Sequence, residues 1–107
     1  MEYHVYVIAD AEEDIFGIYK YVAINDCVQK ADQLFKRMEE KIYSSATLVN
    51  HGHFPPELEQ IGIREYREIH YMPYRIIFSV IEADIYVHCV LDGRRDLEDL
   101  LQERLLR

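Results

Sequence analysis

The chain has 107 residues, of which 50% are hydrophobic and 12% aromatic, with only four glycines and three prolines. This composition excludes a disordered or low-complexity chain, because it supplies enough apolar surface to offset the ordering entropy of a single domain, residues 1–107. Its 20 acidic and 12 basic residues give a formal net charge of −8. That balance argues against a protein that works mainly by binding nucleic-acid phosphates.

The N-terminal segment and the hydropathy of the chain bear on its cellular location. No apolar run approaches the roughly 20 residues that a membrane span needs. Residues 1–10 lack the basic start of a signal peptide, and the acidic residues 12–14 follow directly. The sequence therefore predicts a cytoplasmic protein that makes no membrane contact.

The first half of the chain predicts one strand and two helices. Residues 3–9 alternate aromatic and β-branched side chains, which is typical of a strand. Asp10, with Glu13 three positions later, resembles a capping box and predicts the start of a helix. The break at Asn25 and Asp26 predicts a second helix capped by Asp26, so the two helices form an antiparallel hairpin. The second helix carries an apolar stripe of Val28, Ala31, Leu34, Phe35, Met38 and Ile42.

The second half predicts a loop, three strands and a last helix. Residues 44–62 lose the helical pattern and are expected to form a loop. Strand-like runs follow at 63–71, 74–82 and 85–91, separated by turn residues, and predict an antiparallel meander. Asp96 is expected to cap the last helix. The predicted fold is α+β, in the order β-α-α-β-β-β-α, with the N-terminal helical hairpin packed on a small, mainly antiparallel sheet.

Three motifs carry a resemblance to a known family. They are GIREYR at residues 62–67, the Tyr74-Arg75 pair that opens the middle strand, and DGRRD at residues 92–96. In this order, spread over essentially the whole chain, they resemble the RelE/ParE superfamily of bacterial toxins from type II toxin–antitoxin systems. The resemblance implies a cognate antitoxin as partner, in a homodimer or a toxin–antitoxin complex, and no cofactor.

Members of the superfamily divide by target, and the residues at the catalytic positions separate the two groups. RelE-like toxins cut mRNA on the ribosome with two lysines, two arginines and a C-terminal tyrosine, whereas ParE-like toxins poison DNA gyrase. The lysine positions hold Arg67 and Ile69 here, and the arginine positions hold Arg75 and Arg95. The tyrosine position falls near Leu101. Because a guanidinium stays protonated, Arg67 is a poor general base, so the pattern favours a ParE-like gyrase inhibitor.

Two alternatives remain open at this point. In the first, the chain is a RelE-like ribosome-dependent mRNA endoribonuclease that uses Arg67, Arg75 and Arg95, with His70 as a substitute base. In the second, it is a non-toxic relative that only binds antitoxin. The resemblance implies target binding by Arg67, Arg75, Arg94 and Arg95. The competing interpretation is that these arginines pair with nearby carboxylates, which are Glu65, Glu68, Asp92 and Asp96.

The remaining polar and thiol groups predict no metal site. The two histidines in residues 51–53 have no cysteine or aspartate at ligand spacing, and Cys27 and Cys89 show no metal spacing either. His88 is expected in the sheet. The leucines in residues 97–106 are expected to be mostly core, with any surplus available to an antitoxin or a second copy.

Overall fold

The computed structural model describes residues 2–106. Among these residues no helix is long and apolar enough to cross a membrane. The element order contains every predicted strand and helix and two further short helices. In chain order the elements are β1 (His4–Val7), α1 (Ala9–Asn25), α2 (Val28–Ile42), α3 (Ser45–His51), α4 (Pro56–Glu59), β2 (Arg67–Tyr71), β3 (Tyr74–Ile81), β4 (Asp84–Asp92) and α5 (Glu98–Leu105).

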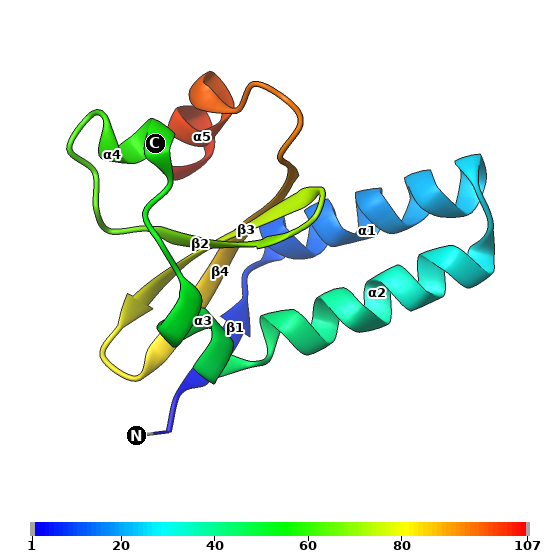
Figure 1. Ribbon diagram of the computed structural model, residues 1–107, viewed down its shortest axis with the longest axis horizontal. Helices are drawn as coiled ribbons and strands as arrows, with labels where there is room; N and C mark the ends of the chain where they lie inside the picture. The colour runs from blue at the N-terminus through cyan, green and yellow to red at the C-terminus, as the bar shows by residue number, and fades with distance from the viewer. Residues whose placement is uncertain (1, 107) are drawn as a thin grey trace.

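The strands form one mixed sheet in the order β1-β4-β3-β2 (Figure 1). β3 is antiparallel to both of its neighbours, β2 and β4. β1 pairs in parallel with β4, with Tyr6 opposite Tyr86. The prediction of an α+β fold with a mainly antiparallel sheet is confirmed.

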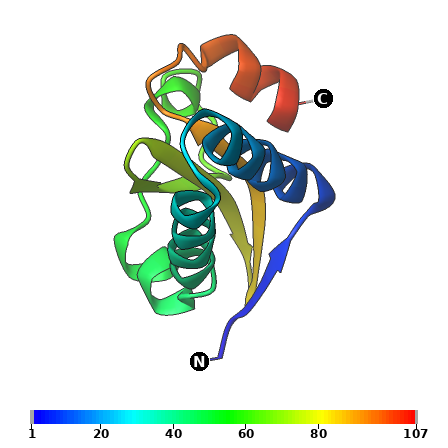
Figure 2. The same cartoon turned by 90° about the vertical axis from the view of Figure 1, so that its right-hand side faces the viewer.

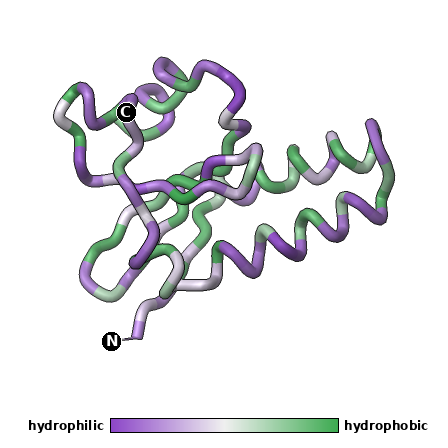
Figure 3. Tube along the Cα trace, in the orientation of Figure 1, coloured by the Kyte–Doolittle hydropathy of each residue, from purple (hydrophilic) through white to green (hydrophobic). Residues whose placement is uncertain are grey.

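The helical hairpin covers one face of the sheet. α1 and α2 run antiparallel, and the hairpin extends beyond the sheet in Figure 1 and is seen nearly end-on, in front of the sheet, in Figure 2. α2 alternates between hydrophilic and hydrophobic stretches along its length (Figure 3), because only one side faces the core. The core on this face is formed by Ala11, Met38, Ile42, Leu48, Ile69, Tyr74, Ile76, Phe78, Ile85, Val87 and Val90.

The opposite face of the sheet is covered by α4 and α5. Leu58 of α4 and Leu101 of α5 are completely buried there, together with Ile77, Cys89, Leu91 and Leu97. β3 is therefore covered on both sides, which explains why its sequence is apolar at both odd and even positions.

The predicted loop at 44–62 is wrong in part, because it contains α3 and α4. Both helices are too short to show a helical period in the sequence. Pro56 occupies the first turn of α4, where the missing N–H is harmless. Between the two helices, His53 forms an antiparallel bridge with Glu68 of β2. The segment is thus anchored to the sheet.

The predicted helix caps at Asp10 and Asp26 are also wrong. α1 begins at Ala9, so its N-cap is Ile8, and Asp10 lies in the first turn, where its charge favours the helix dipole. The N-cap of α2 is Cys27, and Asp26 instead forms an i,i+4 ion pair with Lys30 at 3.1 Å.

The predicted cap at Asp96 and the predicted ends of the strands are displaced by a few residues. The N-cap of α5 is Leu97, and the Asp96 carboxylate accepts a hydrogen bond from the Glu98 N–H at 3.2 Å. The largest shift is in β2, which begins at Arg67 rather than at residue 63.

Two glycines give a matched test of the packing around β3. A Cβ at Gly52 would lie 2.6 Å from the Leu48 carbonyl oxygen and 2.7 Å from the Phe78 ring, whereas a Cβ at Gly17 of α1 would meet no atom within 4 Å. We expect Gly52→Ala to lower the free energy of unfolding by about 1–3 kcal/mol through overpacking. Gly17→Ala should raise it by about 0.5–1 kcal/mol. Urea unfolding of both variants checks the prediction, and equal effects would contradict it.

Candidate functional site

Arg75 lies between two carboxylates on the α4–α5 side of the sheet. Its guanidinium donates to Glu68 at 2.5 and 3.0 Å and to Glu57 of α4 at 2.6 and 2.7 Å. The side chains of Arg75 and Glu68 are only 11% and 1% exposed. The hydrogen bonds between Arg75 and Glu57 lower the pKa of Glu57. The same bonds, together with those to Glu68, raise the pKa of Arg75. This guanidinium is therefore occupied by hydrogen bonds within the protein.

The Gly93 turn between β4 and α5 packs against the aliphatic stem of Arg75. The Gly93 N–H donates to the Pro73 carbonyl at 2.8 Å. A Cβ at Gly93 would lie 2.9 Å from Cγ of Arg75 and 3.1 Å from the Pro73 oxygen. Glycine is required here because the turn approaches β3 so closely, and the approach fixes the position of Arg94 and Arg95.

Both arginines of this turn are exposed. Arg94 donates to the Asp92 carboxylate at 2.7 and 3.0 Å. These hydrogen bonds, with one from the Arg94 N–H, lower the pKa of Asp92 to about 2. The Arg95 backbone N–H bonds the Asp92 carbonyl at 3.3 Å, and its guanidinium stays at the surface. The turn presents two cationic side chains on an acidic protein.

A β-bulge places His88 on the same side of the sheet. Ile77 pairs with Cys89 and Phe78 with Val87, so His88 is the extra residue of β4. A bulge redirects a side chain, and the imidazole Nε2 of His88 lies 2.9 Å from Ser79 Oγ. Burial lowers the pKa of His88, which keeps its ring neutral near pH 7.

His88 and Ser79 line a shallow groove of about 390 Å³, together with Arg64, Glu65, Tyr66, Arg67, Val80 and Ile81. The Tyr66 ring meets His88 edge-on at 5.3 Å, and its hydroxyl donates to the Leu105 carbonyl at 3.1 Å. Arg64 and Arg67 lie over the Phe54 ring at 5.4 and 6.0 Å. A neutral imidazole beside two guanidinium groups combines a proton acceptor with anion-binding groups.

A larger groove of about 580 Å³ is lined by residues of α1 and α2 and reaches Val7 of β1. Three of its aromatic side chains are strongly exposed: Phe16 at 61%, Phe35 at 42% and Tyr43 at 55%. Tyr19 crosses the groove from α1 and donates to Asp32 of α2 at 2.6 Å. Since monomeric proteins rarely leave such apolar area uncovered, this groove is a candidate docking surface.

The structure separates the four arginines predicted for the site. Arg75 and the turn with Arg94 and Arg95 meet where β2 and β3 join. Arg67 lies at the opposite end of β2, across from Phe78, and lines the His88 groove. The competing interpretation of carboxylate pairing fits Arg75 with Glu68 and Arg94 with Asp92. Neither the pairing of Glu57 with Arg75 nor the bulge at His88 leaves a local signal in the sequence, so neither was predicted.

The leucines at the C-terminal end are mostly core, as expected. Leu97, Leu100, Leu101 and Leu105 belong to the core on the α4–α5 face. Leu100 and Leu105 are only partly buried, and Leu106, which follows α5, is 40% exposed.

The family relationship rests on a sequence match and supports the fold just described. Residues 6–97 match the family described as "ParE toxin of type II toxin-antitoxin system, parDE". The chain belongs to the ParE toxin family. A solved structure from the "Chromosomal ParDE TA system from P. aeruginosa" resembles this ParE-family chain with a TM-score of 0.69 and 16% sequence identity, covering 84% of this chain and 95% of that one. At this identity the similarity concerns the fold. No curated protein matches the sequence significantly.

The burial of the Arg75 network in this ParE-family toxin makes a testable prediction. Arg75→Met removes the partner of the buried Glu68 carboxylate and should cost about 3–5 kcal/mol of unfolding free energy. Arg94→Met breaks a solvent-exposed pair and should cost far less. Urea unfolding of the two variants tests this. Equal decreases in the free energy of unfolding would show that burial does not determine how much each ion pair stabilises the fold.

Proposed function

We propose that this protein is a toxin that inhibits DNA gyrase in the cytoplasm and that a cognate antitoxin neutralises it. The match to the ParE toxin family over residues 6–97 carries the proposal. Packing at the RelE-like catalytic positions supports it. Ile69 and Leu101 are 3% and 0% exposed, so these positions contribute to the two cores rather than to proton transfer.

The contact with the target is proposed to lie at the Gly93 turn. Arg94 and Arg95 are exposed there, on a loop held by the rigid β3–β4 pair, which is where binding residues are commonly found. Guanidinium groups suit carboxylates or phosphates on a partner. In this proposal Arg75 acts as a positioning residue, because its stem supports the turn, and Arg67 provides a second cationic contact from the His88 groove.

The antitoxin is proposed to occupy the hairpin groove. The groove exposes aromatic rings and has a rim of acidic residues, which are Glu12, Asp32 and Glu39. An amphipathic helix with an apolar face and basic flanks would complement both features. Such a segment would cover the aromatic surface that the isolated chain leaves open.

Cleavage of RNA is the second candidate function, and the His88 groove is the observation that favours it. Burial lowers the pKa of His88, and the residue lines the same groove as Arg64 and Arg67. It is better placed as a base than His70, whose ring faces the Glu68 carboxylate at 3.6 Å. Arg75, in contrast, is not available to stabilise a phosphorane because Glu57 and Glu68 already bind it.

Two assays on the purified protein separate the candidates. We expect loss of gyrase supercoiling activity with accumulation of cleaved DNA, while translation in a cell-free extract continues at the same protein concentration. The reason is that one lysine position and the tyrosine position hold the buried Ile69 and Leu101, and the other lysine position holds Arg67, a poor general base. Cleavage of mRNA with normal supercoiling would establish the RelE-like alternative. No effect in either assay would identify a non-toxic, antitoxin-binding relative.

Arg95→Ala should reduce toxicity far more than stability. Removing an exposed side chain usually changes stability by at most about 0.5 kcal/mol, whereas loss of a charged contact at a binding hot spot costs roughly 2 kcal/mol, about thirtyfold in affinity. Growth arrest on expression and the melting temperature measure the two effects.

Arg37→Ala is the matched control for this variant, since Arg37 is exposed on α2. Arg104 is unsuitable as a control because it pairs with Asp14 at 2.9 Å and both side chains are less than one-fifth exposed, at 17% and 16%. Full toxicity of Arg95→Ala, or a parallel loss of melting temperature, would reject the role of this turn.

A further inference from the structure

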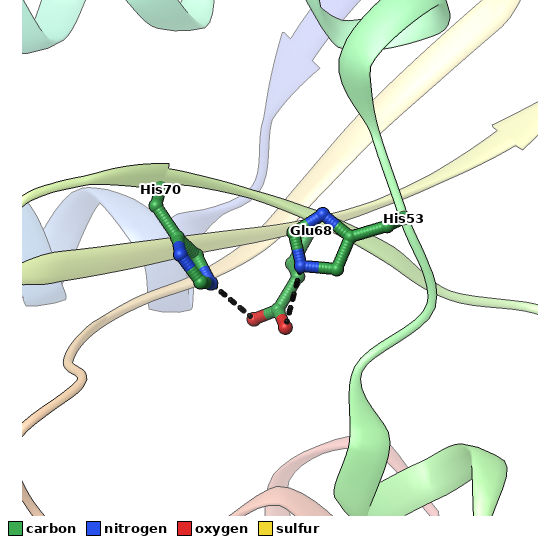
Figure 4. Close-up of side chains that lie close together, drawn as sticks. All are labelled: His53, Glu68 and His70. Atoms are coloured by element: carbon green, nitrogen blue, oxygen red, sulfur yellow. Dashed lines mark ion pairs between the residues drawn. The ribbon is translucent and has the colours of Figure 1, made fainter.

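Two histidines approach the Glu68 carboxylate, which also binds Arg75, from different sides (Figure 4). His53 Nε2 lies 3.3 Å from Glu68 Oε2, and His70 Nε2 lies 3.6 Å from Glu68 Oε1. The possible ligand atoms of the three residues all lie within 4.8 Å of one another. We propose that His53, Glu68 and His70 bind a divalent cation of the zinc class.

The spacing of the three side chains suits tetrahedral zinc. Bonds of about 2.0–2.1 Å in a tetrahedron place neighbouring ligand atoms about 3.3–3.5 Å apart. His53 Nε2 lies at this separation from Glu68 Oε2, at 3.3 Å, and His70 Nε2 lies 3.6 Å from the other oxygen, Oε1. Two imidazoles and one carboxylate are an established set of zinc ligands, with water in the fourth position. The two rings are 52% and 45% exposed, so they have room to turn toward one shared carboxylate oxygen.

The backbone holds the three residues in place before any cation arrives. The His53 N–H donates to the Glu68 carbonyl at 3.0 Å, and the Glu68 N–H donates to the His53 carbonyl at 2.7 Å. His70 lies two residues after Glu68 on β2, and therefore on the same side of the strand. The two imidazole rings are 5.0 Å apart between centroids. A bound cation would link the segment between α3 and α4 to β2.

The charge of the surroundings favours a cation despite the nearby guanidinium. Glu57 binds Arg75 through two hydrogen bonds and balances its charge, so Glu68 leaves one net negative charge when the histidines are neutral. Arg75 also holds the Glu68 carboxylate through two hydrogen bonds, in the way that outer partners orient metal-binding carboxylates.

Solvent can reach the cluster. The side chains of His53 and His70 are 52% and 45% exposed, whereas Glu68 is 1% exposed. The cation would enter between the two rings and meet the carboxylate beneath them.

Zinc titration of the chelator-treated, tag-free protein tests the proposal. We expect one Zn²⁺ per chain by calorimetry, a higher melting temperature with Zn²⁺, and the absorption of tetrahedral Co²⁺ when cobalt replaces zinc. His53→Gln and His70→Gln should each weaken zinc binding by roughly tenfold or more. Both residues are half-exposed, so the variants should fold, and circular dichroism checks this.

His51→Gln is the matched control, because His51 is exposed at the end of α3, two residues from His53, and outside the cluster. It should bind zinc as the unaltered protein does. Absence of binding, unchanged binding in both His53→Gln and His70→Gln, or an equal loss in His51→Gln would each overturn the proposal. The outcome is independent of the supercoiling and translation assays, so the metal site and the proposed function can fail separately.

Discussion

The burial of one positive charge organises the second half of this molecule. Arg75 lies in β3 within a covered sheet, and a buried guanidinium is tolerated only when carboxylates of good geometry surround it. Glu68 of β2 and Glu57 of α4 provide them. This requirement fixes α4 against the sheet, and the aliphatic stem of Arg75 then supports the Gly93 turn. Three elements and one loop thus take their places around one side chain.

The same arrangement reconciles an acidic chain with the cationic binding role proposed for the Gly93 turn. The net charge of −8 is spread over the molecule, whereas Arg94 and Arg95 are presented together at one turn. The apolar hairpin groove lies on α1 and α2, on the other side of the sheet from α4 and α5. A target attracted by the arginines and an antitoxin bound in the groove would therefore meet chemically different surfaces. In that case the bound antitoxin would block the target sterically, and the two partners would not compete for the same side chains.

The sequence was sufficient for the elements that have a clear period and insufficient for those defined by distant partners. The hairpin, the central strand and the leucines of α5 follow from repeated apolar spacing. α3 and α4 are too short for such a pattern. The pairing of Arg75 with Glu57 spans 18 positions, and that of Arg104 with Asp14 spans 90. Nothing local distinguishes these carboxylates from the other acids. His53, Glu68 and His70 were likewise not recognised as a group, because the fold and not the sequence brings them together.

Packing explains why the proton-handling positions of the RNA-cutting relatives are difficult to restore in this chain. Ile69 belongs to the core beneath the hairpin, and Leu101 belongs to the core beneath α4 and α5. A lysine at position 69 would bury an ammonium group among apolar side chains, where an unpaired charge is strongly unfavourable. A tyrosine at position 101 would need room and a hydrogen-bond partner in a core that is already closed. Regaining that chemistry would require both cores to be repacked at once. The exposed arginines on the Gly93 turn require no such change, so the proposed contact with a target is compatible with the packing of both cores.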